Sequence, residues 1–167
     1  MKPWLQRLCG VFGMVLLLVV SACGFQLRGA SHFPFTTICV LGSESSPLGI
    51  QVRRALKNQT NTQLVNNEKE ADVVLELMSE AHEKVILSLN VQGRVSEYTL
   101  VSRLNFRVRN RFGKEFMAPS TLRLTRVLSF NENLVLAKQS EEVALYNDMQ
   151  GDLIQQLIRR LSVMKME

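Results

Sequence analysis

The residues with the clearest chemistry in this sequence are Val20-Ser21-Ala22-Cys23, at the end of a short apolar run. Lys2 and Arg7 precede that run, so the segment has the basic region, apolar region and small-residue cleavage site of a secretory signal peptide. A cysteine directly after the cleavage site is typical of a bacterial lipoprotein signal, in which diacylglycerol is joined to the thiol and a fatty acid to the new amino group. We therefore predict that residues 1–22 are a cleaved signal peptide and that Cys23 is the lipidated first residue of the mature chain.

Two other interpretations of this segment stay open. An ordinary signal peptide with an incidental cysteine would leave the mature chain without lipid. A transmembrane helix is the weaker alternative, because a spanning helix needs about 20 apolar residues and polar sequence resumes at Gln26. If Cys23 is lipidated, its acyl chains anchor the protein to a membrane without such a helix. Gly24 rather than aspartate follows Cys23, which by the usual sorting rule predicts the outer membrane, with the protein facing the periplasm.

The rest of the sequence lacks the residue patterns of catalytic and metal sites. His32 and His82 are the only histidines, and His82-Glu83 is not followed by the second histidine of a zinc-binding helix motif. There is no nucleophile elbow, glycine-rich phosphate loop or cysteine pair with metal spacing. Cys39 lies in an apolar run, where we expect a buried small hydrophobic residue. We therefore predict no catalytic residues, no metal, and no cofactor other than the covalent lipid on Cys23.

Positive charge is concentrated between Arg94 and Arg126, a stretch with eight basic and two acidic residues. We expect a basic stripe on the exposed face of a sheet, with the acidic residues segregated away from it. The stripe would consist of Arg103, Arg107, Arg109 and Arg123.

Arginine at these positions suits the capture of phosphate or carboxylate groups. A solvated face that keeps the sheet soluble is the alternative interpretation. Nucleic acid would be the usual partner of a basic stripe, but the predicted export argues against it. The expected anionic partners are lipopolysaccharide phosphates, anionic lipid headgroups and acidic protein surfaces of the envelope.

The elements that would position these residues follow from the hydrophobic periodicity. Residues 36–41 are β-branched and apolar and predict a short buried strand. Ser46-Pro47 predicts the start of a helix, because serine is a favoured N-cap and proline suits the first helical position. Residues 63–65 are strand-like but lie in a polar stretch that we interpret as a loop.

Three longer stretches alternate between apolar and polar residues, which indicates strands with one covered face. They join through glycine-containing turns into an antiparallel meander. The stretches are residues 73–91, 97–109 and 122–130, and the turns are residues 90–93 and 110–114. In the first stretch the alternating apolar residues are Val73, Leu75 and Leu77, followed by Val85, Leu87, Leu89 and Val91.

A long helix is predicted at the end of the chain, with Ser140 as its N-cap and an apolar stripe at steps of three and four residues. Gly151 inside this helix indicates a close packing contact or a bend. The order strand, helix, three strands, helix predicts an α+β fold, a two-layer sandwich of two helices packed on a four-stranded, mostly antiparallel sheet. We expect residues 35–167 to form this single domain, after a lipidated tether at residues 23–34.

The segment Cys23-Gly24-Phe25-Gln26-Leu27-Arg28-Gly29 resembles the lipid-bearing start of the LptE family of lipopolysaccharide-assembly lipoproteins. The resemblance covers the whole mature chain. Its further motifs are Ser-Pro-Leu at the first helix, Glu97-Tyr98, Arg126 with Phe130, Leu136-Ala137-Lys138 and residues 156–161. It implies two helices on a four-stranded sheet and a role without catalysis. Proteins of this family plug the large outer-membrane β-barrel translocon LptD, are needed for its assembly, and bind lipopolysaccharide during delivery to the cell surface.

The resemblance also implies basic lipopolysaccharide contacts in the first meander hairpin and just before the last helix. Lys138 matches the second position. At the first position this sequence has Val91, and the nearest basic residue is Arg94, beyond Gly93. Lys138 and Arg94 are therefore the candidate lipopolysaccharide-binding residues. The alternative function is a lipid-anchored scaffold or accessory protein of another envelope complex, without lipopolysaccharide binding, and a soluble enzyme comes third.

Overall fold

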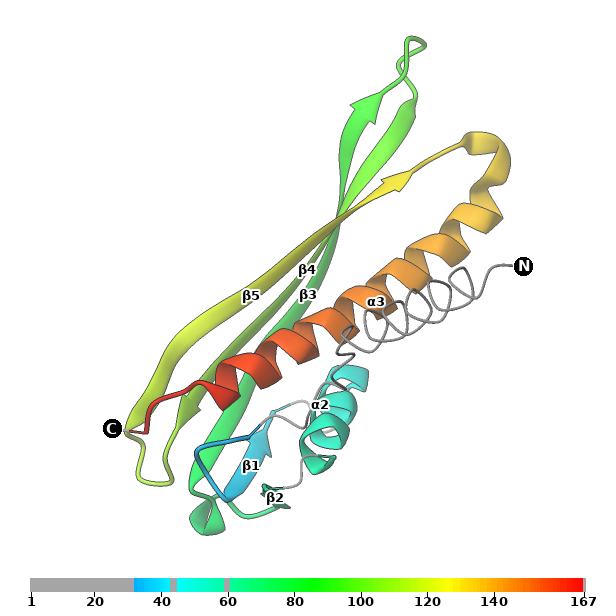
Figure 1. The fold of residues 1–167 in the computed structure, drawn as a ribbon. Helices are drawn as coiled ribbons and strands as arrows, with labels where there is room; N and C mark the ends of the chain where they lie inside the picture. The colour runs from blue at the N-terminus through cyan, green and yellow to red at the C-terminus, as the bar shows by residue number, and fades with distance from the viewer. Residues whose placement is uncertain (1–31, 43–44, 59–60, 167) are drawn as a thin grey trace, which may run out of the picture. The chain divides into compact units, whose positions relative to one another are not determined.

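The computed structural model describes residues 32–42, 45–58 and 61–166. In these ranges the chain forms two α-helices and one five-stranded mixed sheet with the strand order β2-β1-β3-β4-β5 (Figure 1). The α+β class predicted from the sequence is therefore confirmed. The strands are β1 (Thr37–Leu41), β2 (Gln63–Val65), β3 (Val73–Leu89), β4 (Val95–Arg109) and β5 (Glu115–Ser129), the helices are α2 (Pro47–Lys57) and α3 (Val135–Ser162), and two short 3₁₀ helices are η1 (Glu68–Glu70) and η2 (Glu132–Leu134).

The prediction of a four-stranded sheet is wrong by one strand, because residues 63–65 pair with β1 instead of forming a loop. β1 pairs in parallel with both β2 and β3, whereas β3, β4 and β5 form the predicted antiparallel meander. Parallel strands need a crossover between them, and α2 supplies the one from β1 to β2. Periodicity cannot identify β2, since three residues are too few to display an alternation.

The two helices begin differently from each other. In α2 the serine cap is confirmed: Ser46 Oγ accepts a 3.0 Å hydrogen bond from the Gly49 N–H, and Pro47 is the first helical residue. In α3 the predicted cap at Ser140 is wrong, because the helix already begins at Val135. Ser140 Oγ instead donates a 3.2 Å hydrogen bond to the carbonyl oxygen of Leu136 inside the helix, as serine does within helices.

The main hydrophobic core lies between the helices and one face of the sheet. The later part of the predicted apolar stripe of α3 is buried there, from Leu153 onward, together with residues of α2, β1, β3 and β4. Met149 of the same stripe is buried in a second cluster with Leu100 and Leu128. Cys39 is also buried, as predicted, in a smaller cluster with Ala71 and Val74. An added Cβ at Gly151 would meet no atom within 4 Å, which excludes the close packing contact, one of the two alternatives given for that glycine.

A β-bulge at Met78 changes which face of the sheet the later residues of β3 occupy. Leu77 pairs with Phe106 and Ser79 with Asn105, which leaves Met78 as an extra residue. Because side chains alternate along a strand, this extra residue places Val85 on the opposite face, and two further register shifts follow, between Ile86 and Ser88 and between Ser88 and Leu89. The prediction that the whole apolar set of β3 shares one covered face is therefore wrong. The first three members are buried, whereas Val85, Leu87, Leu89 and Val91 are exposed.

The domain begins earlier than the predicted boundary at residue 35. Phe33 is buried in the core, and its ring stacks on Phe35 with 5.0 Å between centroids. The side-chain amide of Asn61 donates a 3.0 Å hydrogen bond to the Phe33 carbonyl oxygen. The predicted signal peptide and Cys23 lie outside the described residues. Among the residues that the structure does describe, no helix has the length and apolarity needed to cross a membrane.

Candidate functional site

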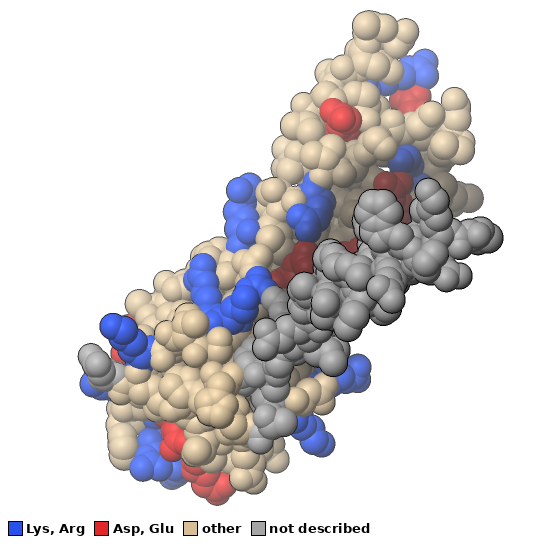
Figure 2. Space-filling view, in the orientation of Figure 1, with Lys and Arg blue, Asp and Glu red and all other residues tan. Residues whose placement is uncertain are grey.

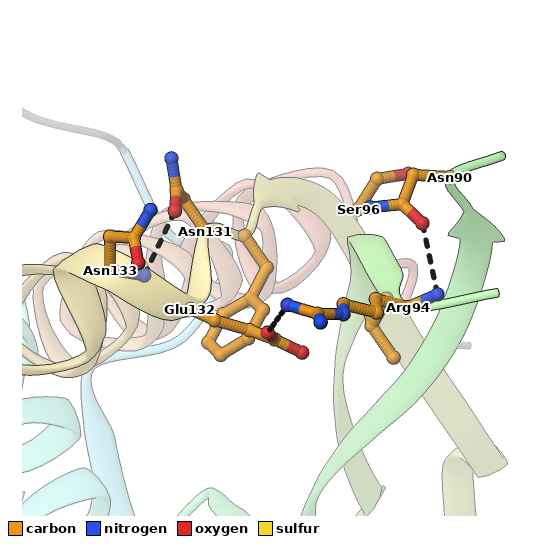
Figure 3. Close-up of a pocket in the computed structure, with 8 residues that line it drawn as sticks. Asn90, Arg94, Ser96, Asn131, Glu132 and Asn133 are labelled. Atoms are coloured by element: carbon orange, nitrogen blue, oxygen red, sulfur yellow. Dashed lines mark hydrogen bonds and ion pairs between the residues drawn. The ribbon is translucent and has the colours of Figure 1, made fainter. Parts of the chain in front are cut away.

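Arg94 ends the turn that joins β3 to β4. Asn90 holds this turn, because its Oδ1 accepts hydrogen bonds of 3.0 Å from the backbone N–H groups of Gln92 and Arg94. Gly93 has a φ of +77°, which glycine adopts without strain. The Arg94 guanidinium extends to η2, where it forms a 2.8 Å ion pair with Glu132 (Figure 3).

A cavity of about 250 Å³ lies between this turn and the residues that follow β5. Figure 3 shows the Arg94–Glu132 pair in it and a second contact, in which Asn131 Oδ1 accepts a 2.9 Å hydrogen bond from the Asn133 N–H. The Arg94 and Glu132 side chains are 64% and 50% exposed. An ion pair so open to solvent contributes less than about 1 kcal/mol, so a phosphate group can replace the Glu132 carboxylate at little cost.

Lys138 lies at the same end of the sheet as Arg94. Its ammonium group donates hydrogen bonds to Ser129 Oγ at 2.9 Å and to Glu141 at 2.8 Å. Ser129 is the last residue of β5 and pairs with Glu97, close to the start of β4. The Lys138 side chain is only 17% exposed, so it is more enclosed than Arg94. The structure thus brings both candidate residues to one end of the sheet, each beside an acidic partner.

This end of the sheet also exposes large apolar side chains. Val85 and Val127 flank Thr99 on the same sheet face, because Thr99 pairs with both of them. More apolar residues come from the turn and from the start of α3. The exposed set is Val85, Ile86, Leu87, Leu89, Val91, Val127, Leu134, Val135, Leu136 and Val143. We call this set, with Arg94 and Lys138, the β3–β4 end; exposed apolar side chains gathered in one region typically mark a binding surface.

A polar cluster under α3 holds the helix over the β3–β4 end. Lys84 forms a 2.5 Å ion pair with Glu142 of α3, and its ammonium lies 4.3 Å from the ring centroid of Tyr98. The Tyr146 hydroxyl donates a 2.8 Å hydrogen bond to the carbonyl oxygen of Glu83, and burial raises the pKa of Tyr146. Sequence reasoning missed this cluster, since Lys84 and Glu142 are far apart in the chain and neither belongs to a motif.

The predicted basic stripe has the expected geometry. Arg103, Arg107 and Arg109 occupy alternate positions of β4 on the sheet face that the helices leave open. Arg123 of β5 pairs directly with Arg103. Among the described residues, no acidic side chain lies within 4.0 Å of Arg123.

The prediction that acidic residues are segregated from the stripe is wrong. Glu76 of β3 forms ion pairs of 2.5 Å with Arg107 and 2.6 Å with Arg109, and Glu83 forms an ion pair with Arg103. Hydrogen bonds from Arg107, and next from Arg109, lower the pKa of the Glu76 carboxyl group. These acids come from the neighbouring strand, so a count along the sequence does not detect them. Figure 2 shows acidic side chains among the basic ones on the visible face.

Two sets of known proteins resemble this chain. The model of the LptE family, described as lipopolysaccharide-assembly, matches residues 35–161. The LPS-assembly lipoprotein LptE of Pectobacterium atrosepticum is 27% identical over 158 residues, which cover 90% of this chain and 84% of the relative. The LPS-assembly lipoprotein LptE of Yersinia enterocolitica is 28% identical over 151 residues, which cover 88% of this chain and 72% of the relative.

Solved structures of lipoproteins have the same fold. The solution NMR structure of the uncharacterized lipoprotein B from Nitrosomonas europaea matches with a TM-score of 0.73 and 35% identity, over 83% of this chain and 90% of that chain. The crystal structure of the rare lipoprotein B from Shewanella oneidensis matches with a TM-score of 0.63 and 28% identity, over 75% of this chain and 90% of that chain. This chain therefore shares its fold with these lipoproteins over most of its length.

Proposed function

Because the chain belongs to the LptE family of lipopolysaccharide-assembly lipoproteins, we propose that it plugs a large outer-membrane β-barrel of the LptD type and binds lipopolysaccharide during its insertion at the cell surface. In this proposal, acyl chains on Cys23 hold the protein at the periplasmic side of the outer membrane. The protein catalyses no reaction and needs no cofactor beyond that lipid. Family membership alone supports the coarser statement, a lipoprotein with a role in lipopolysaccharide assembly.

The observation that carries lipopolysaccharide binding is the arrangement of the β3–β4 end, with Arg94 and Lys138 beside exposed apolar side chains. Lipopolysaccharide is an amphiphile with phosphate groups on its sugars and apolar acyl chains. Guanidinium and ammonium groups bind phosphate, and the apolar side chains offer contact to the acyl chains. Both halves of the ligand therefore have a chemical counterpart in one region of the domain.

The binding experiment compares the two charged ends of the sheet. Arg94→Gln with Lys138→Gln removes two cations from the β3–β4 end, and Arg111→Gln with Lys114→Gln makes the same change in charge at the β4–β5 turn. If each cation contributes about 1 kcal/mol to binding an anionic lipid, the first double variant loses about 30-fold in lipopolysaccharide affinity. The control retains its affinity and both fold as judged by circular dichroism. Unchanged binding in the first variant would remove Arg94 and Lys138 from the site.

The barrel partner is tested by affinity purification from solubilised outer membranes, with the bound protein and lipid identified. Recovery of a large β-barrel protein together with lipopolysaccharide supports the proposal. Deletion of the gene then separates it from the alternative of a scaffold in another envelope complex. Loss of surface lipopolysaccharide and of the mature barrel is expected; an intact surface with a different envelope defect would favour the scaffold.

A further inference from the structure

The cavity beside Arg94 is bordered mostly by side chains that form hydrogen bonds. Three asparagines, a serine and the Arg94–Glu132 pair line it, and Val95 and Phe130 are its apolar part. Its volume of about 250 Å³ is below the range of about 300–1,000 Å³ that is typical of sites for drug-sized molecules. The cavity therefore suits a single ring with polar substituents, and not the acyl chains of an amphiphile.

Amide groups at the cavity have donors to offer to a ligand. Asn90 and Asn131 use their side-chain oxygens to hold the backbone of the β3–β4 turn and of η2, which fixes both side chains in place (Figure 3). In the described part of the chain, the amide NH₂ groups of these two residues and of Asn133 have no hydrogen-bond partner. Each such group has two N–H donors, which suits a ligand with several oxygen atoms.

The apolar part of the cavity is also fixed. The Phe130 N–H donates a 2.7 Å hydrogen bond to the carbonyl oxygen of Ser96. The Phe130 ring packs edge-on against Tyr98, with 5.3 Å between the centroids. A sugar ring has C–H groups on its faces and hydroxyl groups around its rim, so Val95 and Phe130 can contact a face while the polar side chains bind the rim.

The charges around this cavity are balanced and not simply basic. Carboxylates already pair with the cations of the β3–β4 end, and the pairs are Arg94–Glu132, Lys138–Glu141 and Lys84–Glu142. A bare phosphate that takes Arg94 leaves Glu132 without its partner, so one contact is gained and another is lost. A ligand with hydroxyl groups beside its phosphate replaces both partners, because a hydroxyl group donates to a carboxylate.

We propose that this cavity binds the ring of a phosphorylated sugar. The phosphate takes the place of Glu132 on the Arg94 guanidinium, which can donate two parallel hydrogen bonds to it. Hydroxyl groups of the sugar donate to Glu132, and the amides of Asn90 and Asn133 donate to its oxygen atoms. The inference rests on the proposed function and deepens it: the phosphorylated sugar is the part of lipopolysaccharide that the cavity recognises, and the acyl chains are left to the exposed apolar side chains.

Soluble probes without acyl chains test the cavity by itself. The isotope-labelled protein, purified from membranes in detergent, is titrated with N-acetylglucosamine 1-phosphate, with inorganic phosphate and with N-acetylglucosamine. The shifts of its amide signals in NMR spectra give the three dissociation constants. At about pH 8 both phosphates are dianions, since their second pKa is far lower, so the ratio of their affinities measures the contribution of the sugar ring.

We expect the sugar phosphate to bind about tenfold more tightly than inorganic phosphate, from two or more hydrogen bonds to the ring. The sugar without phosphate should bind more weakly than the sugar phosphate. Asn133→Ala should lower the affinity for the sugar phosphate about three- to tenfold and leave that for inorganic phosphate unchanged. The matched control is Asn147→Ala, which removes an exposed amide of α3 outside the cavity and should change neither affinity.

Glu132→Gln separates a sugar site from an ordinary ion pair. The substitution removes the carboxylate that competes for Arg94, so inorganic phosphate should bind more tightly. It also removes the charged acceptor for the sugar hydroxyl groups, and hydrogen bonds to charged groups are about twice as strong as neutral ones. The preference for the sugar phosphate over inorganic phosphate should therefore narrow. Circular dichroism checks that all three variants are folded.

Equal affinities of the unaltered protein for the sugar phosphate and inorganic phosphate would overturn the inference and leave Arg94 as a phosphate contact. A preference that neither Asn133→Ala nor Glu132→Gln reduces would also overturn it, because the sugar would then bind elsewhere.

The affinity for lipopolysaccharide tells a failure of this inference from a failure of the proposed function. Saturating sugar phosphate should lower the apparent affinity for lipopolysaccharide. Lipopolysaccharide binding that the sugar phosphate does not weaken would refute the cavity and leave the proposed function standing. No lipopolysaccharide binding, together with a sugar preference that depends on Asn133, would refute the proposed function and support the cavity as a site for a phosphorylated sugar.

Discussion

The two hairpin turns of the meander have the same backbone but opposite surroundings. In each, an asparagine side chain accepts two backbone N–H groups and a glycine with positive φ precedes a basic residue. Near the β4–β5 turn the apolar residues Phe106 and Val108 of β4 are buried, whereas near the β3–β4 turn the strands expose apolar side chains. The difference teaches that local contacts determine the shape of a turn, while the elements packed around it determine what the turn can bind.

β3 runs from the buried part of the sheet to the exposed β3–β4 end. Its first residues are buried on both faces: Val73 and Leu75 pack in the main core under the helices, and Val74 packs on the other face with Cys39 and Ala71. Its last residues extend beyond β1, and most of their side chains are exposed. A single strand can therefore serve as core at one end and as binding surface at the other.

The largest test of this comparison replaces the same residue type at both ends of β3. Leu75→Ala should lower the free energy of unfolding by about 2–5 kcal/mol, because it opens a cavity in the core, where Leu75 is fully buried. Leu87→Ala should change it by less than about 0.5 kcal/mol, since Leu87 is half exposed. Urea denaturation measures both. Equal losses would mean that the far end of β3 is packed in solution.

The next test compares two ion pairs on the open sheet face. Glu76→Gln should cost about 2 kcal/mol, since Glu76 is mostly enclosed and accepts hydrogen bonds from Arg107 and Arg109. Glu83→Gln should cost less than about 1 kcal/mol, because the Glu83–Arg103 pair is largely exposed. Comparable costs for the two variants would contradict the difference in burial between the two halves of the sheet.

The contribution of Glu76 should depend on pH in a defined direction. Its pKa in the folded protein is below the ordinary value of 4.5, chiefly because of the hydrogen bond from Arg107. The unfolded chain therefore takes up this proton at a higher pH than the folded chain does. The stability from Glu76 is complete above about pH 4.5 and is lost as the pH falls through the folded-state pKa. Denaturation of wild type and Glu76→Gln over this pH range should show their difference disappearing in acid.

The prediction with the smallest expected effect is that the same substitution destabilises the two turns equally. Gly93→Ala and Gly113→Ala each place a side chain in the left-handed region, which costs about 1 kcal/mol, and at neither position would the added Cβ meet an atom within 4 Å. We expect the two losses in unfolding free energy to agree within about 0.5 kcal/mol. A clearly larger loss at one turn would indicate that its surroundings also stabilise the turn backbone.

The candidate site was predictable only in part. The positions of Arg94 and Lys138 followed from a family resemblance, and the structure adds that both lie at one end of the sheet. Their acidic partners, Glu132 and Glu141, were not anticipated. The positions of the arginine stripe followed from alternation in β4, but its neutralisation by Glu76 did not, because that acid belongs to another strand.

By itself, the sequence determined the features that depend on residues within a few positions of one another: the serine cap of α2, the glycine turns and the apolar stripe of α3. Only the tertiary structure decided the fifth strand, the bulge at Met78 and the ion pairs between strands. A cap or a turn is stabilised by contacts between near neighbours in the chain. The register of a strand and the partner of a charged side chain depend on which segments the fold brings beside them, and no short window of sequence contains that information.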